Sequence, residues 1–177
     1  MNSFICKQNR NKSLNKFAIF ILVFTFLVLT GCGYYSFKGS LPSYIQNVAV
    51  PLFDDNTAYP GVREDLTNKV VDAFIADNTL KITDESSADI IVSGTISSIS
   101  QRAAVLTKGE TVEEFQIYVN VKAKCEDVKN NKVLWEKTIS QYGLMAGIGS
   151  QDDRDLAIAE AMDKITEDII NNTLANW

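Results

Sequence analysis

Two stretches of the chain place apolar residues at the spacing of an amphipathic helix. The first is predicted to begin at Pro60, because proline suits the first helical position, and to end near Asp77. Its apolar stripe is Val62, Leu66, Val70 and Phe74, widened by Val71 and Ile75. The second follows Ser150, a predicted N-cap, and carries the stripe Ile158, Met162, Ile165 and Ile169.

Four other stretches indicate β-strands. Residues 115–126 alternate strictly between apolar and polar, which is typical of a half-buried strand. Residues 45–53 and 89–99 follow the same period less regularly. Asn130-Asn131 tolerates left-handed backbone and precedes a further strand over residues 133–142, so a β-hairpin is expected there.

The order of these elements, β-α-β-β-β-α, predicts an α+β fold. Both helices have one apolar stripe and the sheet has one apolar face, so they bury these surfaces together. We therefore expect a two-layer α/β sandwich with two helices packed on one face of a four-stranded mixed sheet. The strands flanking the first helix are expected to be parallel. The opposite face of the sheet is left to water or to a partner.

The first 31 residues have the layout of an export signal. Four bases precede an apolar run of 13 residues, Phe17 to Leu29, which is too short for a membrane-spanning helix. Leu29-Thr30-Gly31-Cys32 resembles a bacterial lipobox. We expect residues 1–31 to be a signal peptide cleaved after Gly31, with Cys32 acylated by a lipid anchor that includes palmitate. The alternative is an uncleaved signal anchor with an incidental cysteine.

A short tether over residues 32–44 then leads to one domain over residues 45–177. Gly33 follows the predicted lipidation site, and no aspartate stands there to retain the protein in the inner membrane. No acidic cluster that would resemble a surface-export tag follows. The sequence therefore predicts attachment to the outer membrane on its periplasmic side.

Charge and composition narrow the function. The chain has 17 basic and 22 acidic residues, and loss of the four signal-peptide bases leaves a formal net charge of −9, which argues against nucleic-acid binding. It contains no histidine, so Ser-His-Asp and Cys-His catalysis and His-containing zinc sites are excluded. Cys125 falls within a strand pattern and is expected to be a buried thiol rather than a nucleophile.

No catalytic, metal or cofactor site is predicted. The acidic clusters are Asp54-Asp55, Asp152-Asp153-Asp155 and Glu167-Asp168. They lie in turns or at helix ends, where carboxylates are favoured by solvation and the helix dipole. The stretch 143–150, GLMAGIGS, lacks the lysine and the spacing of a phosphate-binding loop and is expected to be a hinge or loop.

Four basic residues are candidates for binding lipid phosphates. Lys122 and Lys124 are expected on the outward face of their strand, and Arg102 and Lys108 lie at or near the preceding connection. One interpretation is a solvated sheet face whose charges oppose aggregation. The other is a local cationic surface for an anionic lipid on an acidic protein.

The order of several motifs is similar to that of the lipopolysaccharide-assembly lipoprotein family, LptE. The most informative pieces are Gly33, Tyr35 and Phe37 after the cysteine, Val48-Ala49-Val50-Pro51, Phe53 to Thr57, and Pro60-Gly61. SADIIVSGTI (87–96), KVLWEKTI (132–139) and a closing acidic amphipathic helix follow in the same order.

The resemblance implies a non-enzymatic function. Members of this family sit as a plug inside a large outer-membrane β-barrel, LptD, and help it to assemble and to deliver lipopolysaccharide to the outer leaflet. One alternative is a lipoprotein of similar fold that activates a cell-wall synthase or serves a curli-type secretion pore. The other is a lipid-anchored hydrolase, which would lose activity on substitution of Asp54 or Asp152.

Overall fold

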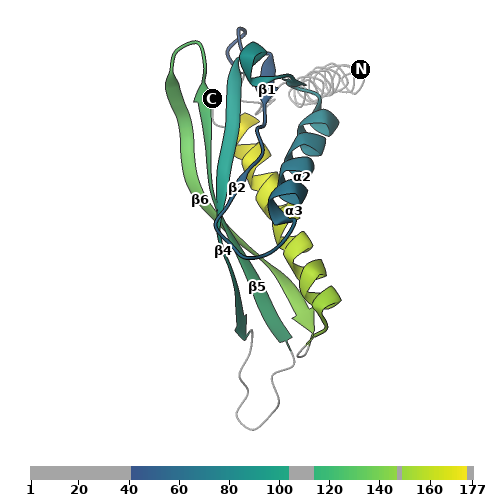
Figure 1. The fold of residues 1–177 in the computed structure, drawn as a ribbon. Coiled ribbons are helices and arrows are strands. Elements are labelled where there is room, and N and C mark those ends of the chain that lie inside the picture. The colour runs from purple at the N-terminus through teal and green to yellow at the C-terminus, as the bar shows by residue number, and fades with distance from the viewer. Residues whose placement is uncertain (1–40, 104–113, 147–148, 175–177) are drawn as a thin grey trace, which may run out of the picture. The chain divides into compact units, whose positions relative to one another are not determined.

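The computed structural model describes residues 41–103, 114–146 and 149–174. In this part of the chain, two long helices lie on one face of a mixed sheet of six strands (Figure 1). Five strands follow the order β3-β1-β4-β5-β6, and β2 pairs with β4 further along. The predicted two-layer α+β architecture is confirmed, but the sheet has two more strands than predicted. Both additional strands contain only two residues, too few to show a period in the sequence.

The first predicted strand, over residues 45–53, is shorter than expected, and a second short strand follows directly after its predicted end. Only β1 (Asn47–Ala49) and β2 (Asp54–Asp55) of this region pair with the sheet, and each lies parallel to β4. Pro51, which lies between them, has no backbone N–H to donate, so it does not continue a sheet ladder. The second added strand, β3 (Lys81–Ile82), lies parallel to β1, and the short 3₁₀ helix η1 (Glu85–Ser87) follows.

Helix α2 (Val62–Asp77) follows β2 and precedes β3 in the sequence. Strands β1 and β4, which correspond to the two strands predicted to flank it, are parallel as expected. The helix begins two residues later than predicted. Gly61 has φ 83°, a left-handed conformation outside the α-helical region, so Pro60 lies before the helix. The stripe Val62, Leu66, Val70 and Phe74 is buried, as predicted. Ile75 does not widen it: this side chain is 59% exposed, because it lies about 100° around the helix from Phe74.

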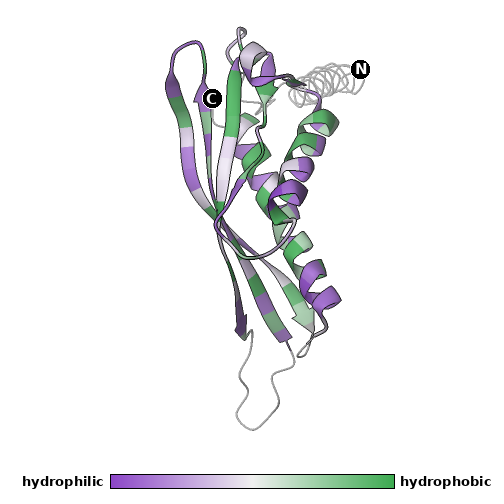
Figure 2. Ribbon diagram, in the orientation of Figure 1, coloured by the Kyte–Doolittle hydropathy of each residue, from purple (hydrophilic) through white to green (hydrophobic). Residues whose placement is uncertain are grey.

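Three long antiparallel strands form the rest of the sheet: β4 (Ile90–Ala103), β5 (Glu114–Asp127) and β6 (Lys132–Ala146). The hairpin between β5 and β6 is confirmed, and Asn131 adopts φ 49° in its turn. All three strands are longer than predicted. The inward side chains of β5 are buried as the alternation predicts: Ile117, Val119, Val121, Ala123 and Cys125. Figure 2 shows the alternating hydrophilic and hydrophobic bands along these strands.

A β-bulge interrupts β4. The register with β5 shifts between Ile96 and Ser98, so Ile99 lies opposite the inward residue Val119. Without the bulge, the period of two would place Ser98 on the inner face and Ile99 on the outer one. The bulge occurs where β2 stops pairing with β4, since Asp55 lies opposite Ile96.

Helix α3 (Gln151–Leu174) runs back along β6. Its start is capped as predicted: the backbone N–H of Ser150 donates to Asp153 Oδ2 (2.7 Å), and the N–H of Asp153 donates to Ser150 Oγ (3.2 Å). The stripe Ile158, Met162, Ile165 and Ile169 is buried. No helix in the described ranges is both long and apolar enough to cross a bilayer.

Gly143 was predicted to lie in a loop, but it belongs to β6. A Cβ atom at this position would lie 1.9 Å from the backbone oxygen of Ala157 in α3. The glycine therefore allows the helix to pack directly on the strand backbone. Gly147 and Ile148 of the same predicted loop lie outside the described residues.

Candidate functional site

Helices α2 and α3 leave the outer face of the sheet uncovered (Figure 1), and most of the outward side chains of its central strand β5 are polar. The outward side chains of β5 are Gln116, Tyr118, Asn120, Lys122, Lys124 and Glu126. Serine and threonine of β4 and β6 flank several of them: Ser98 and Ser140 lie beside Asn120, and Thr95 and Thr138 lie beside Lys122. This surface can form hydrogen bonds with a partner across its whole width.

A cavity of about 470 Å³ lies on this outer face. The chain between β1 and β2 forms one wall with Pro51 and Leu52, and β4, β5 and β6 form the floor. Leu52 and Val133 are exposed apolar side chains of this cavity. Its charged lining residues are Asp54, Lys122, Lys124, Glu126 and Glu136.

The structure brings the predicted bases Lys122 and Lys124 together in this cavity, and each has a carboxylate partner. Lys122 Nζ lies 2.7 Å from Glu136 Oε1, and Lys124 Nζ lies 2.8 Å from Glu126 Oε2. The hydrogen bond from Lys122 lowers the pKa of Glu136. Because the cavity has two cationic and three anionic side chains, its lining is not positively charged overall. An anionic ligand would have to displace a carboxylate from either lysine.

The predicted base Arg102 lies elsewhere on the same face. It is opposite Gln116 on β5, six residues from Lys122, which corresponds to roughly 20 Å along a strand. Its guanidinium carbon lies 4.6 Å from the centroid of the Tyr118 ring, a cation–π contact. Among the described residues, no carboxylate forms an ion pair with Arg102. Lys108, the fourth candidate, and the predicted cleavage and lipidation residues Gly31 and Cys32 lie outside the described residues.

Arg102 is the first member of a row that crosses the sheet, here called the aromatic row: Arg102, Tyr118, Tyr142 and Lys164. The rings of Tyr118 and Tyr142 lie on adjacent strands with centroids 5.3 Å apart and planes tilted by 41°. Lys164 of α3 places its Nζ 5.0 Å from the centroid of the Tyr142 ring. Sequence reasoning did not identify the two tyrosines as neighbours, because their pairing depends on the register of the hairpin.

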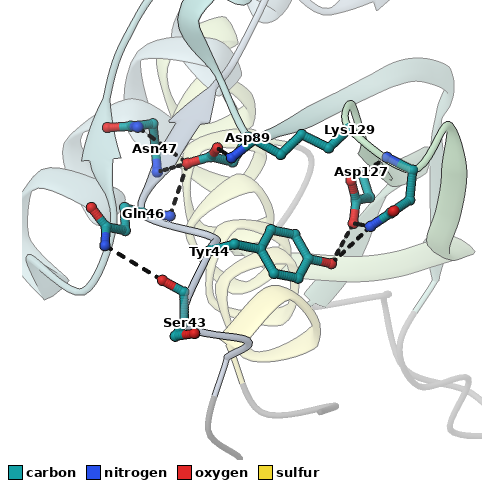
Figure 3. A network of polar contacts seen from close by, with 8 residues as sticks. Ser43, Tyr44, Gln46, Asn47, Asp89, Asp127 and Lys129 are labelled. Carbon is teal, nitrogen blue, oxygen red and sulfur yellow. Dashed lines mark hydrogen bonds and ion pairs between the residues drawn. The ribbon is translucent and has the colours of Figure 1, made fainter.

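The sequence analysis also did not predict a second polar cluster. It lies beside the start of β4, at the opposite end of this strand from Arg102 (Figure 3). The buried carboxylate of Asp89 accepts hydrogen bonds through Oδ2 from the backbone N–H groups of Gln46 and Asn47, each at 3.0 Å. Its Oδ1 lies 2.8 Å from Lys129 Nζ. The hydrogen bond with Lys129 and those with the two backbone N–H groups lower the pKa of Asp89 to about 2.

Tyr44 extends this cluster to the β5–β6 turn. Its hydroxyl donates to Asp127 Oδ2 (2.6 Å), and Lys129 Nζ lies 5.7 Å from the centroid of its ring. Asn130 donates to the same carboxylate oxygen through Nδ2 (2.8 Å). The segment where the predicted tether meets the domain is thus fixed to the turn between β5 and β6.

The remaining candidates have structural roles, but two acidic clusters lie elsewhere than predicted: Asp54-Asp55 forms β2, and Glu167-Asp168 lies inside α3. Cys125 is buried, and burial together with Glu126 and Asp127 raises the pKa of its thiol to about 12, so it stays protonated. In the acidic cluster at the start of α3, Asp153 caps the helix and Asp155 accepts a hydrogen bond from Tyr59. Across the described ranges, no three acidic or cysteine side chains converge as ligands for a metal ion.

The family model LptE, described as lipopolysaccharide-assembly, matches residues 45–173 of the chain. This range contains the sheet, α2, all but the last residue of α3, the aromatic row, and Asp89 with its partners Gln46, Asn47 and Lys129. No curated protein matches the chain in sequence.

Solved structures share the fold. Protein XCC0632 from Xanthomonas campestris is 14% identical, with a TM-score of 0.58 over 77% of this chain and 90% of that one. The hypothetical protein CT253 from Chlamydia trachomatis is 10% identical, with a TM-score of 0.57 over 73% and 95%. Rare lipoprotein B from Shewanella oneidensis is 15% identical, with a TM-score of 0.50 over 72% and 93%. At these identities the likeness establishes the fold alone.

Proposed function

Because the chain belongs to the lipopolysaccharide-assembly family LptE, we propose that it is the lipoprotein partner of a large outer-membrane β-barrel similar to LptD. It acts as a plug in this barrel, helps it to assemble, and takes part in inserting lipopolysaccharide into the outer leaflet. The chain itself catalyses no reaction in this proposal. Its function depends on the surfaces that it presents to the barrel and to the lipid.

The uncovered polar face of the sheet is the observation that carries the proposal. The interior of a large outer-membrane barrel is polar, so a plug must present hydrogen-bonding groups to it. The outer face of β4, β5 and β6 offers hydroxyl, amide and ion-paired side chains over its length. Both helices lie on the other side, where they complete the core and leave this face available.

The proposal includes the predicted attachment to the membrane. Residues 1–31 are removed as a signal peptide, Cys32 carries the lipid, residues 32–44 are the tether, and residues 45–177 form the single family domain. The protein then lies on the periplasmic side of the outer membrane. Intact-mass measurement of the membrane-extracted protein tests this: it should begin at Cys32 and carry acyl chains. A mass that still includes residues 1–31, or that lacks acyl chains, overturns the attachment.

Lipopolysaccharide contact is proposed for Arg102, Lys108, Lys122 and Lys124, with Arg102 first among the described bases. Arg102 has no carboxylate partner in the described ranges, whereas both lysines would have to leave one. We therefore expect Arg102→Glu to weaken binding of purified lipopolysaccharide more than Lys122→Glu. A charge reversal of all four bases that leaves binding unchanged would eliminate these contacts.

Affinity purification in mild detergent tests the partnership. We expect the tagged full-length chain, expressed in the bacterium that encodes it, to recover a large outer-membrane β-barrel. The two proteins should be present at about 1:1, because one plug occupies one barrel. Its reproducible absence overturns the proposal. Recovery of a cell-wall synthase in its place would favour the activator function considered from the sequence.

A further inference from the structure

The edge of β4 is open beyond the bulge. Up to Ile96 the strand has neighbours on both sides, and the last contact on its outer side is the N–H of Asn56 donating to the carbonyl oxygen of Ile96 (3.0 Å). From Ser98 to Ala103 the strand pairs with β5 alone. In the described ranges no other segment pairs with this stretch, and Figure 1 shows it at the margin of the sheet. Four of its six residues are exposed.

The backbone groups that face this edge can be assigned from the register. Tyr142 directs its carbonyl oxygen outward from β6, where it accepts a hydrogen bond from Lys164 Nζ (2.8 Å). The residue opposite it, Tyr118, therefore directs its backbone groups toward β4, and Ser100 opposite Tyr118 directs its own toward β5. By this alternation, the N–H and C=O groups of Ile99, Gln101 and Ala103 face the open edge.

The opposite edge of the sheet is closed at the same level. Besides the contact of Lys164 with Tyr142, the backbone N–H of Leu144 donates to Glu160 Oε2 (3.1 Å), and Glu160 and Lys164 form an ion pair at 2.8 Å. The side chains of Glu160 and Lys164 in α3 thus form hydrogen bonds with two backbone groups on the outer edge of β6. Exposed strand edges are usually protected against pairing with other chains. Here one edge is protected and the other is not.

The open stretch also lacks the residues that usually discourage pairing. Ser98–Ala103 reads SISQRA, with no proline, lysine or acid. Its one charge, on Arg102, lies over the ring of Tyr118 on the outer face, so it does not obstruct the edge. The guanidinium has no carboxylate partner in the described part of the chain, and its position beside the edge suits an incoming acidic residue.

We propose that Ser98–Ala103 receives an extended segment of a protein partner as an added strand, with a carboxylate of that segment paired to Arg102. Main-chain hydrogen bonds to Ile99, Gln101 and Ala103 provide the contact, as in other cases of strand addition. The proposal deepens the proposed function and rests on it for the identity of the partner, the outer-membrane barrel. A second copy of this chain is a poorer occupant, because the same stretch paired with itself contains no carboxylate for Arg102.

Proline substitution tests the proposal in the full-length lipoprotein. Gln101→Pro removes an outward N–H and leaves the donors of Ser100 and Arg102 toward β5 in place. Gln101→Ala is the matched control, because both variants lose the hydrogen bond from Arg154 Nη1 to Gln101 Oε1 (2.7 Å) while only the proline loses the backbone donor. We expect Gln101→Pro to reduce the co-purified barrel by about tenfold and Gln101→Ala to leave it near the wild-type amount.

Three further measurements keep the outcomes distinct. Thermal unfolding shows whether each variant is folded, and Ala103→Pro at the end of the strand replaces Gln101→Pro if the latter is not. Arg102→Glu should also reduce recovery, and Arg102→Lys should retain more of it than Arg102→Glu does. Amide hydrogen exchange over residues 98–103 should slow when the barrel is bound.

The inference is overturned if folded Gln101→Pro and Ala103→Pro recover as much barrel as the wild type. A wild-type chain that recovers no barrel overturns the proposed function and this inference together. Light scattering of the purified protein tests the other possible occupant of the edge, a second copy of this chain. If the wild type is a dimer and Gln101→Pro is a monomer, the edge pairs with a second copy and the proposal is overturned.

Discussion

At the end of the sheet near the turn between β5 and β6, β4 has a neighbouring strand on each side. At the end near Ala103 and Glu114, the described residues form three strands, and β4 pairs with β5 alone. The first is called here the closed end and the second the open end. At the closed end, the backbone N–H groups of Gln46 and Asn47 and the Lys129 ammonium surround one buried carboxylate, Asp89. At the open end, backbone groups of β4 face the unpaired edge, and the rings of Tyr118 and Tyr142 with the Arg102 guanidinium lie on the outer face of the sheet.

The difference separates two uses of polar residues in one sheet. A buried polar group must find its partners inside the molecule, so the Asp89 cluster specifies how the chain enters the domain and where the β5–β6 turn lies. An exposed edge or an unpaired guanidinium is satisfied by water until a partner replaces it. We therefore expect substitutions at the closed end to affect stability first, and surface substitutions at the open end to affect binding first.

The largest expected effect is the loss of a core side chain near the closed end. Phe74 is fully buried in α2, and Phe74→Ala should lower the free energy of unfolding by about 3–5 kcal/mol, because a large cavity remains. Its neighbour Ile75 is 59% exposed, so Ile75→Ala is a matched control and should change stability by less than about 0.5 kcal/mol. Urea-unfolding curves measure both. Equal effects would place Ile75 in the core, against the structure.

Gly143→Ala should be the next largest, and it tests whether the open end also has a position that matters for stability. The added Cβ would lie 1.9 Å from the backbone oxygen of Ala157, so α3 must move away from β6 at a cost of about 3 kcal/mol. Gly61→Ala has no atom within 4 Å of its Cβ and should cost only about 1 kcal/mol through its positive φ. Hydrogen exchange at Leu144 should accelerate in Gly143→Ala alone. A wild-type exchange rate there would contradict the close packing.

Asp89→Asn tests the polar cluster of the closed end. The loss of charge-assisted bonds to Lys129 and to the two backbone N–H groups should cost about 2 kcal/mol at neutral pH. Because folding lowers the pKa of Asp89 from 3.8 to about 2, its contribution is present above about pH 4 and is lost as the pH falls toward 2. Wild-type stability should therefore fall through this range more steeply than that of Asp89→Asn.

Unfolding measured at pH 7, 4 and 2 gives the comparison for Asp89, and hydrogen exchange at Gln46 and Asn47 reports the local loss. Asp84→Asn is the control, since Asp84 is exposed and precedes η1. It should retain the wild-type dependence on acid. The assignment of this effect to Asp89 is wrong if the two variants respond to acid alike.

The smallest expected effect concerns the ion pairs of the outer face. Lys122→Ala removes a pair whose side chains are 61% and 44% exposed, and water screens such pairs well. The midpoint of thermal unfolding should stay within about 1 °C of wild type. A larger shift would mean that the outer face also stabilises the fold and would weaken the contrast between its charges and the Asp89 cluster.

Much of the fold could be predicted from the sequence, because helical and strand periods are local. The buried stripe of α2, the capped start of α3 and the alternation of β5 follow from residues within a few positions of one another. The predictions were wrong where a local signal was too short or was overridden by tertiary pairing. Strands β2 and β3 have two residues each, and Gly143 belongs to β6 because it pairs with Ile117 of β5.

The candidate site was less accessible from the sequence. The outward direction of Lys122 and Lys124 follows from the period of two, but their carboxylate partners depend on the hairpin register and the side-chain geometry. Tyr44 and Asp127 lie 83 positions apart in the chain, and no local pattern relates them.

The sequence by itself determined the periods of the helices and main strands, the absence of histidine chemistry, and the prediction of a lipid-anchored chain whose function lies in its surfaces. The tertiary structure alone decided which bases keep a carboxylate partner and which edge of the sheet is protected. The physical reason is that a period needs only neighbouring residues, whereas an ion pair or a closed edge requires residues from distant segments to meet at hydrogen-bonding distance.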